Sequence, residues 1–251
     1  MTKKNLFDII IIGSGLSGIS LALELSKRTK KKVLILEKKK KNYYEKNFCF
    51  WNKPENFFTE KFDNTWKKIS VIVDDKKKTL ADNEIKYLRL KSISFFKIAT
   101  NEIKKNKSFK ILMGQNIKKI YKAGKKNSVH SNGKIFNSEI VFDSRHQFKK
   151  KNGLLYQHFY GCDISFNKNV FDTDEVTFMD IQKNNNFFHF FYVLPFSKKN
   201  ALIETTYFST NDFTTEKYLN DIKDYIKKKF NNINYKIGFT EKGKIPMHYF
   251  P

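Results

Sequence analysis

The sequence predicts an α/β protein of two interleaved parts, one with a parallel sheet and helical crossovers, the other with antiparallel strands. Two observations lead to this prediction. In residues 6–37 an apolar strand, a glycine-rich turn, an apolar helical stretch and a second apolar strand follow one another, which is the order of a βαβ unit. From Gly153 to Ser209 aromatic-rich runs of strand length alternate with polar breaks, a pattern typical of antiparallel sheets. We therefore assign residues 1–150 to the first part and residues 151–251 to the second.

The glycine-rich turn has the spacing of a dinucleotide-binding fingerprint. Gly13, Gly15 and Gly18 form G-x-G-x-x-G, Ser14 lies between the first two glycines, and Glu37 ends the strand after the helix. In this Rossmann-like arrangement the first glycine allows the tight turn, the second the close approach of a pyrophosphate, and the third close helix–strand packing. The pyrophosphate would lie at the helix N-terminus. Glu37 would accept hydrogen bonds from ribose hydroxyls and disfavours a 2′-phosphate, so FAD or NAD is expected here rather than NADP.

Further strand and helix signals complete the first part. A helix is predicted over residues 92–105, and strands are predicted at residues 69–73, 86–90, 109–113, 116–121 and 139–143. Asn132 and Gly133 mark a turn before the last of these strands. The strand at 139–143 is apolar and ends in an acid, and we expect it to return to the nucleotide-binding sheet.

The second part is predicted to be an antiparallel sheet with one covering helix. Its expected strands are residues 155–164, 176–180, 187–195 and 201–208. Thr214 and Thr215 precede an amphipathic run that ends at Phe230, which predicts a helix with a threonine N-cap. A sheet of this kind suits a substrate domain combined with a nucleotide-binding fold.

The net charge of +24 raises the question of a nucleic-acid partner. The basic residues are almost all lysine, with only Arg28, Arg89 and Arg145 as arginines, and the lysine runs are scattered along the chain. Because no nucleic-acid-binding motif accompanies them, we expect no specific nucleic-acid partner. An anionic membrane surface is a better partner for such charge, since each lysine near the lipid contributes without a motif.

Cysteine usage and hydropathy indicate the cellular compartment in which the protein is expected. Cys49 and Cys162 have neither metal-ligand spacing nor a disulfide framework. We therefore expect no metal site, and we expect a reducing, cytoplasmic compartment. The apolar stretch from Leu6 to Leu25 includes Asp8 and Glu24 and fits the nucleotide turn better than a membrane span or a signal peptide. We therefore expect a cytoplasmic protein that associates with the membrane peripherally.

Five segments of the second part carry a resemblance. They are Tyr156–Gly161, Phe178–Asp180, Phe191–Ser197, Leu202–Ser209 and Gly243–Met247. Their order and spacing, together with the Phe48–Trp51 segment, resemble the FAD-containing lycopene cyclase family. The resemblance extends from residue 7 to the last residue, whereas the glycine fingerprint alone is shared with many flavoproteins of the same fold.

The resemblance implies a carotenoid cyclase, an intramolecular lyase or isomerase that converts the ψ-end groups of lycopene to β-ionone rings. The reaction has no net redox change but requires FAD in its reduced form, with NADPH as the external reductant. Glu204 matches the essential glutamate of the family and would protonate the terminal double bond. Burial among aromatic residues would keep such a carboxyl protonated. Asp180 matches an aspartate of the Met-Asp segment and is a candidate for orienting that acid, with a strand-end cap as an equal alternative.

The resemblance also concerns one arginine, and it has three departures. The first is His146, which stands where glycine is usual after a segment, Asp143-Ser144-Arg145, that resembles the one closing the nucleotide sheet of the family. Arg89 matches a position where related flavoproteins place a basic or polar group near the FAD phosphates, and a guanidinium pairs with phosphate in a way that lysine does not. Thr205 stands where many family members carry a second acid. The chain ends at Pro251, before the glycine-rich segment and tunnel helices of the family. We therefore expect a C-terminally truncated form, with a separate polypeptide supplying the remainder as the less favoured alternative, and we do not expect this chain alone to be active.

Two other function classes fit part of the sequence. A FAD-dependent monooxygenase or reductase acting on an isoprenoid or other lipophilic substrate would share the fingerprint and the fold. Such an enzyme would consume one nicotinamide per product, which a cyclase would not. A non-enzymatic protein that binds membranes or nucleic acid through its charge would lose that binding in salt and would carry no flavin.

Overall fold

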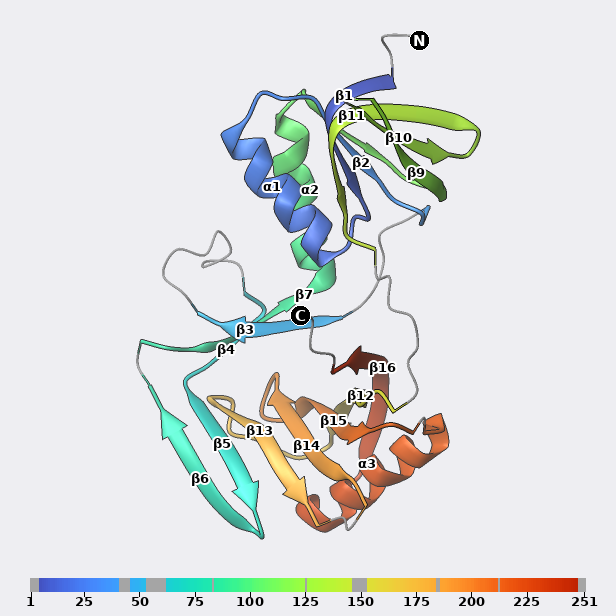
Figure 1. The fold of residues 1–251 in the computed structure, drawn as a ribbon. Coiled ribbons are helices and arrows are strands. Elements are labelled where there is room, and N and C mark those ends of the chain that lie inside the picture. Colours follow the sequence, from blue (N-terminus) through green and yellow to red (C-terminus); the bar gives the residue numbers. More distant parts are fainter. Residues whose placement is uncertain are drawn as a thin grey trace. The chain divides into compact units, whose positions relative to one another are not determined.

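The computed structural model describes residues 5–40, 46–52, 62–82, 84–124, 126–145, 153–183, 186–211 and 213–247 (Figure 1). The chain divides into two compact units, residues 1–45 with 91–148, and residues 46–90 with 149–251. The predicted division placed all of residues 1–150 in the first part, whereas residues 46–90 belong to the second unit. The reason is strand pairing, because the strand at residues 68–73 lies parallel to the strand at residues 175–182.

The first unit is a Rossmann-like α/β unit with a six-stranded sheet in the order β8-β2-β1-β11-β10-β9. The parallel strands are β1 (Leu6–Ile12), β2 (Val33–Leu36), β8 (Phe109–Leu112) and β11 (Lys134–Asp143), and β9 (Ile117–Ala123) and β10 (Lys126–Ser131) continue antiparallel. Helices α1 (Leu16–Arg28) and α2 (Ser92–Lys105) pack together on this sheet (Figure 1). The isoleucines at residues 9–12 are buried, as expected of a central parallel strand.

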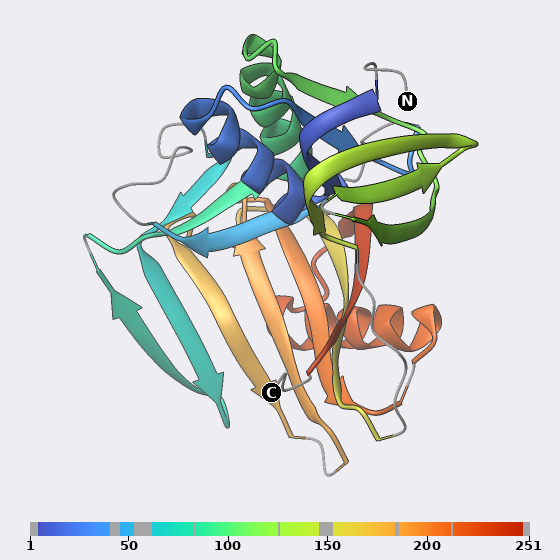
Figure 2. The same ribbon diagram turned by 45° about the horizontal axis from the view of Figure 1, so that its top comes forward.

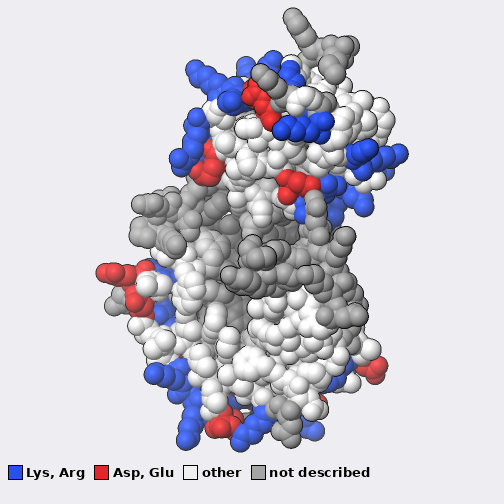
Figure 3. Space-filling view, viewed as in Figure 1, with Lys and Arg blue, Asp and Glu red and all other residues white. Residues whose placement is uncertain are grey.

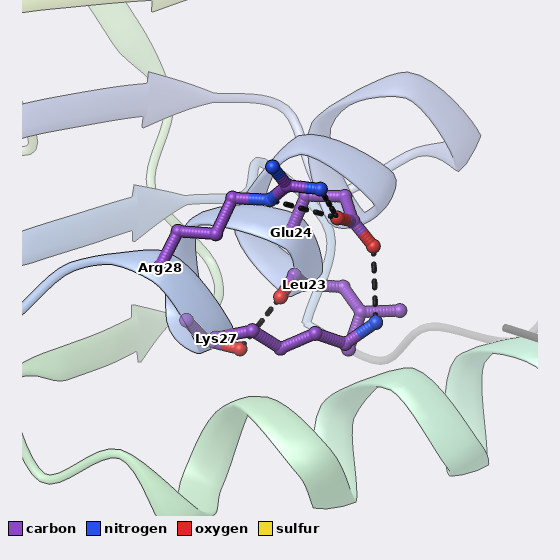
Figure 4. A network of polar contacts seen from close by, with 5 residues as sticks. Leu23, Glu24, Lys27 and Arg28 are labelled. Atoms are coloured by element: carbon purple, nitrogen blue, oxygen red, sulfur yellow. Dashed lines mark hydrogen bonds and ion pairs between the residues drawn. The ribbon is translucent and has the colours of Figure 1, made fainter.

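Helix α1 shows why the apolar N-terminal stretch is no membrane span. Ile19, Ala22 and Leu23 are buried, while Glu24 lies on the outer face. There Glu24 pairs with Lys27 at 3.0 Å and with Arg28 at 3.2 Å (Figure 4), exposed contacts that contribute only ~0.3–0.5 kcal/mol each. Residues 6–25 are therefore strand, turn and amphipathic helix. Among the residues described, no helix has the length and hydropathy needed to cross a membrane.

The second unit contains a seven-stranded mixed sheet in the order β16-β12-β15-β14-β13-β5-β6. These strands are β5 (Lys68–Val73), β6 (Lys76–Ala81), β12 (Tyr156–Phe166), β13 (Glu175–Gln182), β14 (Phe188–Pro195), β15 (Asn200–Ser209) and β16 (Tyr235–Pro246). A small sheet has the order β3-β7-β4, with β3 (Asn47–Trp51), β4 (Asn64–Trp66) and β7 (Tyr87–Lys91). Helix α3 (Thr215–Phe230) lies along one face of the large sheet (Figure 2).

The two faces of β15 contact different surroundings. Ala201 and Ile203 pack with Ile222 and Ile226 of α3. Leu202, one position along, packs instead with Trp66, Tyr87, Val176 and Leu194 on the opposite face. Because side chains alternate along a strand, Glu204 shares the face of Leu202. The acid is thus directed away from the helix.

Several predicted elements are confirmed. Helix α2 has the predicted bounds, and Thr214 caps α3 by accepting a hydrogen bond from Lys217 N at 3.2 Å. Asn132 and Gly133 both have positive φ, at 46° and 75°, in the hairpin between β10 and β11, as a type I′ turn requires. The strand pattern did not predict β3, β4, β6, β10 or β16, and the last of these omissions affects the site.

Candidate active site

Glu204 lies in the wall of a cavity of about 480 Å³ in the second unit. The wall is mostly aromatic and aliphatic. Its members are Tyr87, Phe159, Phe178, Met179, Phe190, Tyr192, Leu194, Leu202, Phe208 and Ile245, with Lys46, Asn47, Cys49, Gln157, Glu204, Glu241 and Lys242 as the remaining side chains. A concave, mainly apolar cavity with a few converging polar groups is the usual form of a small-molecule site.

The carboxyl of Glu204 is held in its protonated form. Burial raises its pKa to about 8, and the neighbouring Glu241 adds to the rise, while a hydrogen bond from Thr206 Oγ1 to Glu204 Oε1 at 2.9 Å opposes it. Desolvation disfavours the charged form of an acid. At neutral pH Glu204 is therefore mainly a carboxylic acid, which is the state that a proton donor needs.

Aromatic rings surround this acid in edge and face arrangements. The rings of Tyr87 and Phe178 lie 5.7 Å apart at 86°, and those of Phe178 and Tyr192 lie 5.9 Å apart at 88°. Tyr192 Oη donates a hydrogen bond to Tyr87 Oη at 2.8 Å, which fixes both rings. Faces of such rings attract cations. The cavity therefore combines a proton donor with a wall that stabilises positive charge without water.

Cys49 is the one thiol in the cavity wall. Burial raises its pKa to about 12, so the sulfur is a thiol at physiological pH. Because the thiolate is the nucleophilic form, Cys49 contributes an apolar surface to the wall rather than a reactive group.

The structure does not bring Asp180 to Glu204. Asp180 Oδ2 accepts a hydrogen bond from Tyr225 Oη at 3.0 Å and pairs with Lys229 Nζ at 3.0 Å, both on α3. Simple alternation would place Asp180 on the cavity face with Phe178. A β-bulge between Thr177 and Asp180 shifts the register and directs Asp180 to the helix face. The predicted role in orienting the acid is thus replaced by a contact that holds α3.

Glu241 is the cavity carboxyl that the sequence pattern missed. It lies on β16, opposite Gly161 of β12, and Gly161 in turn lies opposite Glu204 of β15. Asn47 Nδ2 donates to Glu241 Oε1 at 2.8 Å. Tyr235, Ile237 and Phe239 alternate with other residues, which is a strand pattern, but the polar residues after Phe239 do not continue it and no strand was predicted there. The available signals were this alternation and the position of Glu241, two residues before Gly243 of a recognised segment.

The first unit contains the dinucleotide fingerprint in the expected form. Gly13 has a φ of +92°, and a Cβ there would lie 2.5 Å from Ser144 Oγ; a Cβ at Gly18 would overlap Gly13 O. Gly15, the N-cap of α1, has nothing within 4 Å of such a Cβ. The first and third glycines are therefore required by packing. The second leaves open space at a helix N-terminus, which is where a pyrophosphate binds.

Glu37 and Ser14 tie the second strand to this turn. Glu37 Oε2 accepts hydrogen bonds from Ser14 N at 2.7 Å and from Ser14 Oγ at 2.9 Å, and Lys39 N donates to Oε1 at 2.9 Å. Burial alone would raise the pKa of Glu37, but these hydrogen bonds outweigh it and the pKa is lowered. Glu37 is thus an anion beside the turn, as an acceptor for ribose hydroxyls has to be.

Arg89 lies in the second unit and is buried. Its Nε donates to Asn47 Oδ1 at 2.6 Å and its Nη1 to Asn64 Oδ1 at 2.8 Å, and its guanidinium carbon lies 3.5 Å from the centre of the Phe196 ring. The guanidinium is therefore held by neutral amides and an aromatic face. Its role toward the FAD phosphates stays a prediction.

Comparison with known proteins bears on both units. A family model described as lycopene cyclase protein matches residues 8–250. No sequence among curated proteins gave a significant match. Many solved structures share the fold, among them a geranylgeranyl bacteriochlorophyll reductase-like protein from Thermoplasma acidophilum, with a TM-score of 0.68, 12% identity, and 96% of this chain and 66% of that chain covered.

Two further structural matches are a halogenase and a monooxygenase. The halogenase PltM in complex with phloroglucinol and FAD matches with a TM-score of 0.68 and 14% identity, covering 96% of this chain and 60% of that one. The p-nitrophenol 4-monooxygenase PnpA from Pseudomonas putida matches with a TM-score of 0.66 and 10% identity, covering 96% and 69%. At such identities the likeness concerns the fold. The chain spans about two thirds of the length of the structures it matches.

Proposed function

The chain belongs to the lycopene cyclase family, and on that premise we propose that it converts the ψ-end group of lycopene, or of a related linear carotenoid, to a β-ionone ring. The observation that carries the proposal is Glu204, a protonated acid in an aromatic cavity. Protonation of an alkene needs a carboxylic acid close to an apolar substrate, and the carbocation that follows needs a wall without nucleophiles. The reaction is an isomerisation with no net oxidation or reduction.

The residues of the cavity have separate tasks in this proposal. Glu204 delivers its proton to the terminal double bond of the end group. The chain of the carotenoid then closes on the cationic carbon, and loss of a proton leaves the ring double bond. Tyr87, Phe178 and Tyr192 stabilise the positive charge through their rings. The rest of the apolar wall positions the end group and excludes water.

FAD is the proposed cofactor, with NADPH as the external reductant. The residues that would hold it are Gly13, Ser14, Gly15, Gly18 and Glu37, and the open side of Gly15 fits the approach of a pyrophosphate. When bound and reduced, the flavin supplies an electron-rich ring that stabilises a neighbouring cation. The anionic Glu37, held by the turn, is the acceptor for the adenosine ribose.

The proposed location is the cytoplasmic surface of a membrane. A linear carotenoid is dissolved in the bilayer, so an enzyme acting on it has to reach the lipid surface. Figure 3 shows lysine and arginine side chains on both units, most of them toward the edges of the face that it displays. With a net charge of +24, this protein is attracted to anionic lipid.

The decisive experiment supplies lycopene in liposomes together with FAD and NADPH. We expect ring-containing products in the pigment analysis and much less than one NADPH oxidised per ring formed. Hydroxylated or saturated products with one NADPH consumed for each would overturn the proposal and identify a monooxygenase or reductase instead. Failure of the protein to acquire a flavin chromophore would contradict the cofactor assignment.

A further inference from the structure

Resting on the proposed function, we propose that Glu241 is the proton acceptor of the same site and takes up the proton that the cyclised cation loses. Cyclisation begins with a proton donated and ends with a proton removed. After the first step Glu204 is itself a carboxylate, but it lies at the carbon that it protonated, whereas the proton is lost from another carbon of the end group. A second carboxyl in the same cavity supplies an acceptor for that proton, and Glu241 has the position for it.

The strand register places the two carboxyls on either side of one glycine. Gly161 pairs with Glu204 on one side and with Glu241 on the other, so all three lie in a row across β15, β12 and β16. A Cβ at Gly161 would lie 3.6 Å from Glu204 Cβ and 3.3 Å from Glu241 Cγ. Any larger residue would stand between the two acids. Both side chains line the same cavity.

Burial raises the pKa of both carboxyls, but more groups oppose the rise at Glu241 than at Glu204. Arginine has only donors, so the Oδ1 of Asn47 accepts the hydrogen bond from Arg89 Nε at 2.6 Å. This fixes the orientation of the amide, and its Nδ2 donates a hydrogen bond to Glu241 Oε1 at 2.8 Å. Two N–H groups of Asn47 thus face Glu241, the second being its backbone N at 3.4 Å from Oε2. Donors directed at a carboxyl favour its anion.

The charged neighbours reinforce this difference. Lys46 and Arg89 lie on the side of Glu241, with Asp163 as an opposing anion. Glu204 has the neutral Tyr87, Tyr192 and Cys49 around it, and the hydroxyl of Thr206 as its hydrogen-bond donor. When environments separate two carboxyls in this way, the one kept neutral is the acid and the other is the base. Arg89 becomes a positioning residue, since it acts on Glu241 through Asn47.

The proposed step balances in atoms and charge. The Glu204 carboxylic acid gives its proton to an alkene carbon, a carbon–carbon bond closes the ring, and a tertiary cation remains. A C–H bond next to that cation then breaks, its electron pair becomes the new ring double bond, and its proton goes to the Glu241 carboxylate. Glu241 returns the proton to Glu204 before the next turnover. Nothing is oxidised or reduced.

The test compares E241Q with E241D, E204Q and the matched control E175Q in the liposome assay. Glutamine at 241 keeps the shape and still accepts from Asn47, so we expect a folded protein. Ring formation should fall on the order of 100-fold or more, and the residual product should contain a larger share of rings with the double bond in another position. E241D retains a carboxylate and should restore the wild-type ring pattern at a reduced rate.

A second readout does not depend on turnover. In a carbon-13 carboxyl titration, the Glu204 signal should have a lower pKa in E241Q than in the wild type, because the neighbouring anion is gone. E175Q should leave that signal and the ring formation unchanged, since Glu175 pairs with Lys77 and does not line the cavity.

The outcomes separate this inference from the proposed function. Wild-type rate and ring pattern in E241Q, with E204Q inactive, would overturn the role of Glu241 and leave the cyclase proposal intact. An unchanged Glu204 titration in E241Q would equally contradict a coupled pair. If the wild type itself forms no rings, the proposed function fails and this inference fails with it.

Discussion

At the scale of single residues, the protonation state of Glu204 decides which chemistry the cavity is able to support. A glutamate at the surface of this lysine-rich chain would be an anion in an ion pair, as Glu24 is. Glu204 differs because its strand directs it into an apolar cavity, where burial raises its pKa to about 8. The same side chain type is thus a helix-surface anion at one position and a candidate acid at another. The difference comes from the fold, and it gives the first predictions.

Substitution of Glu204 by glutamine should remove ring formation. Glutamine keeps the shape and accepts from Thr206 but has no proton to give, so the loss should be on the order of 10,000-fold or more. The matched control is T205A. Thr205 is buried and bonded to His189 on the other face of the sheet, so its loss should change the rate per folded molecule little. Substantial conversion by E204Q would exclude Glu204 as the donor.

Glu204 also predicts that activity and stability both fall as the pH rises. Its pKa is raised from 4.5 to about 8 in the folded chain, so ring formation should decline as the pH rises through about 8. Stability is lost between about pH 4.5 and pH 8, because the unfolded chain releases this proton near 4.5 while the folded chain keeps it. E204Q should therefore be about as stable as the wild type at pH 4 and roughly 4 kcal/mol more stable at pH 8. Denaturant titrations at the two pH values would detect the difference, and equal stabilities at pH 8 would contradict it.

Gly15 allows a clean test of cofactor binding. A Cβ there meets nothing within 4 Å, so G15V should fold normally while its side chain fills the space for the pyrophosphate. We expect loss of FAD binding, measured by flavin fluorescence, with an unchanged unfolding midpoint. G18A is the contrasting variant, because its Cβ overlaps Gly13 O and should destabilise the unit. Normal flavin binding by G15V would contradict the assignment.

At the scale of elements, the sequence predicted the strands and helices whose own residues are apolar. Ile9–Ile12, the helix at residues 92–105 and the threonine cap of α3 carry their signals locally. Strand β16 has an alternating apolar signal only in its first half, and the polar half that carries Glu241 is held by pairing with β12. The strand of Glu204 was therefore predicted from its own residues and the role of Glu204 from the family resemblance, whereas the place of Glu241 depended on a neighbour about 80 residues earlier in the chain.

The bulge in β13 is a second feature that no local pattern indicates. It moves Asp180 from the expected cavity face to α3, where Tyr225 and Lys229 hold it. We expect D180N to lower the free energy of unfolding by roughly 1–3 kcal/mol, because Lys229 loses its shorter ion pair, keeps Asp75 at 3.6 Å and stays partly exposed. The rate of ring formation per folded molecule should remain within about threefold of the wild type. A folded D180N without activity would restore the orienting role predicted from the sequence.

At the scale of the whole molecule, the net positive charge of the chain favours an anionic partner surface, and this attraction does not depend on any single residue. The second unit places six aromatic side chains in the wall of the cavity, namely Tyr87, Phe159, Phe178, Phe190, Tyr192 and Phe208, and Figure 3 shows lysine and arginine side chains on the outer surface. A net charge of +24 in a chain with few arginines favours a diffuse anionic surface over a patterned one such as a nucleic-acid groove. An enzyme for a membrane-dissolved hydrocarbon would use that attraction to dwell at the lipid surface.

This reasoning predicts binding to vesicles that depends on lipid charge and on salt. The protein should pellet with liposomes containing anionic lipid at low ionic strength and should remain in the supernatant with neutral liposomes. Added salt should release it, since screening shortens the Debye length to roughly 3 Å at 1 M. Lycopene within neutral vesicles is the informative control, because binding there would indicate that the apolar substrate, rather than the lipid charge, recruits the protein. Equal pelleting with both lipids at all salt concentrations would contradict the electrostatic mechanism.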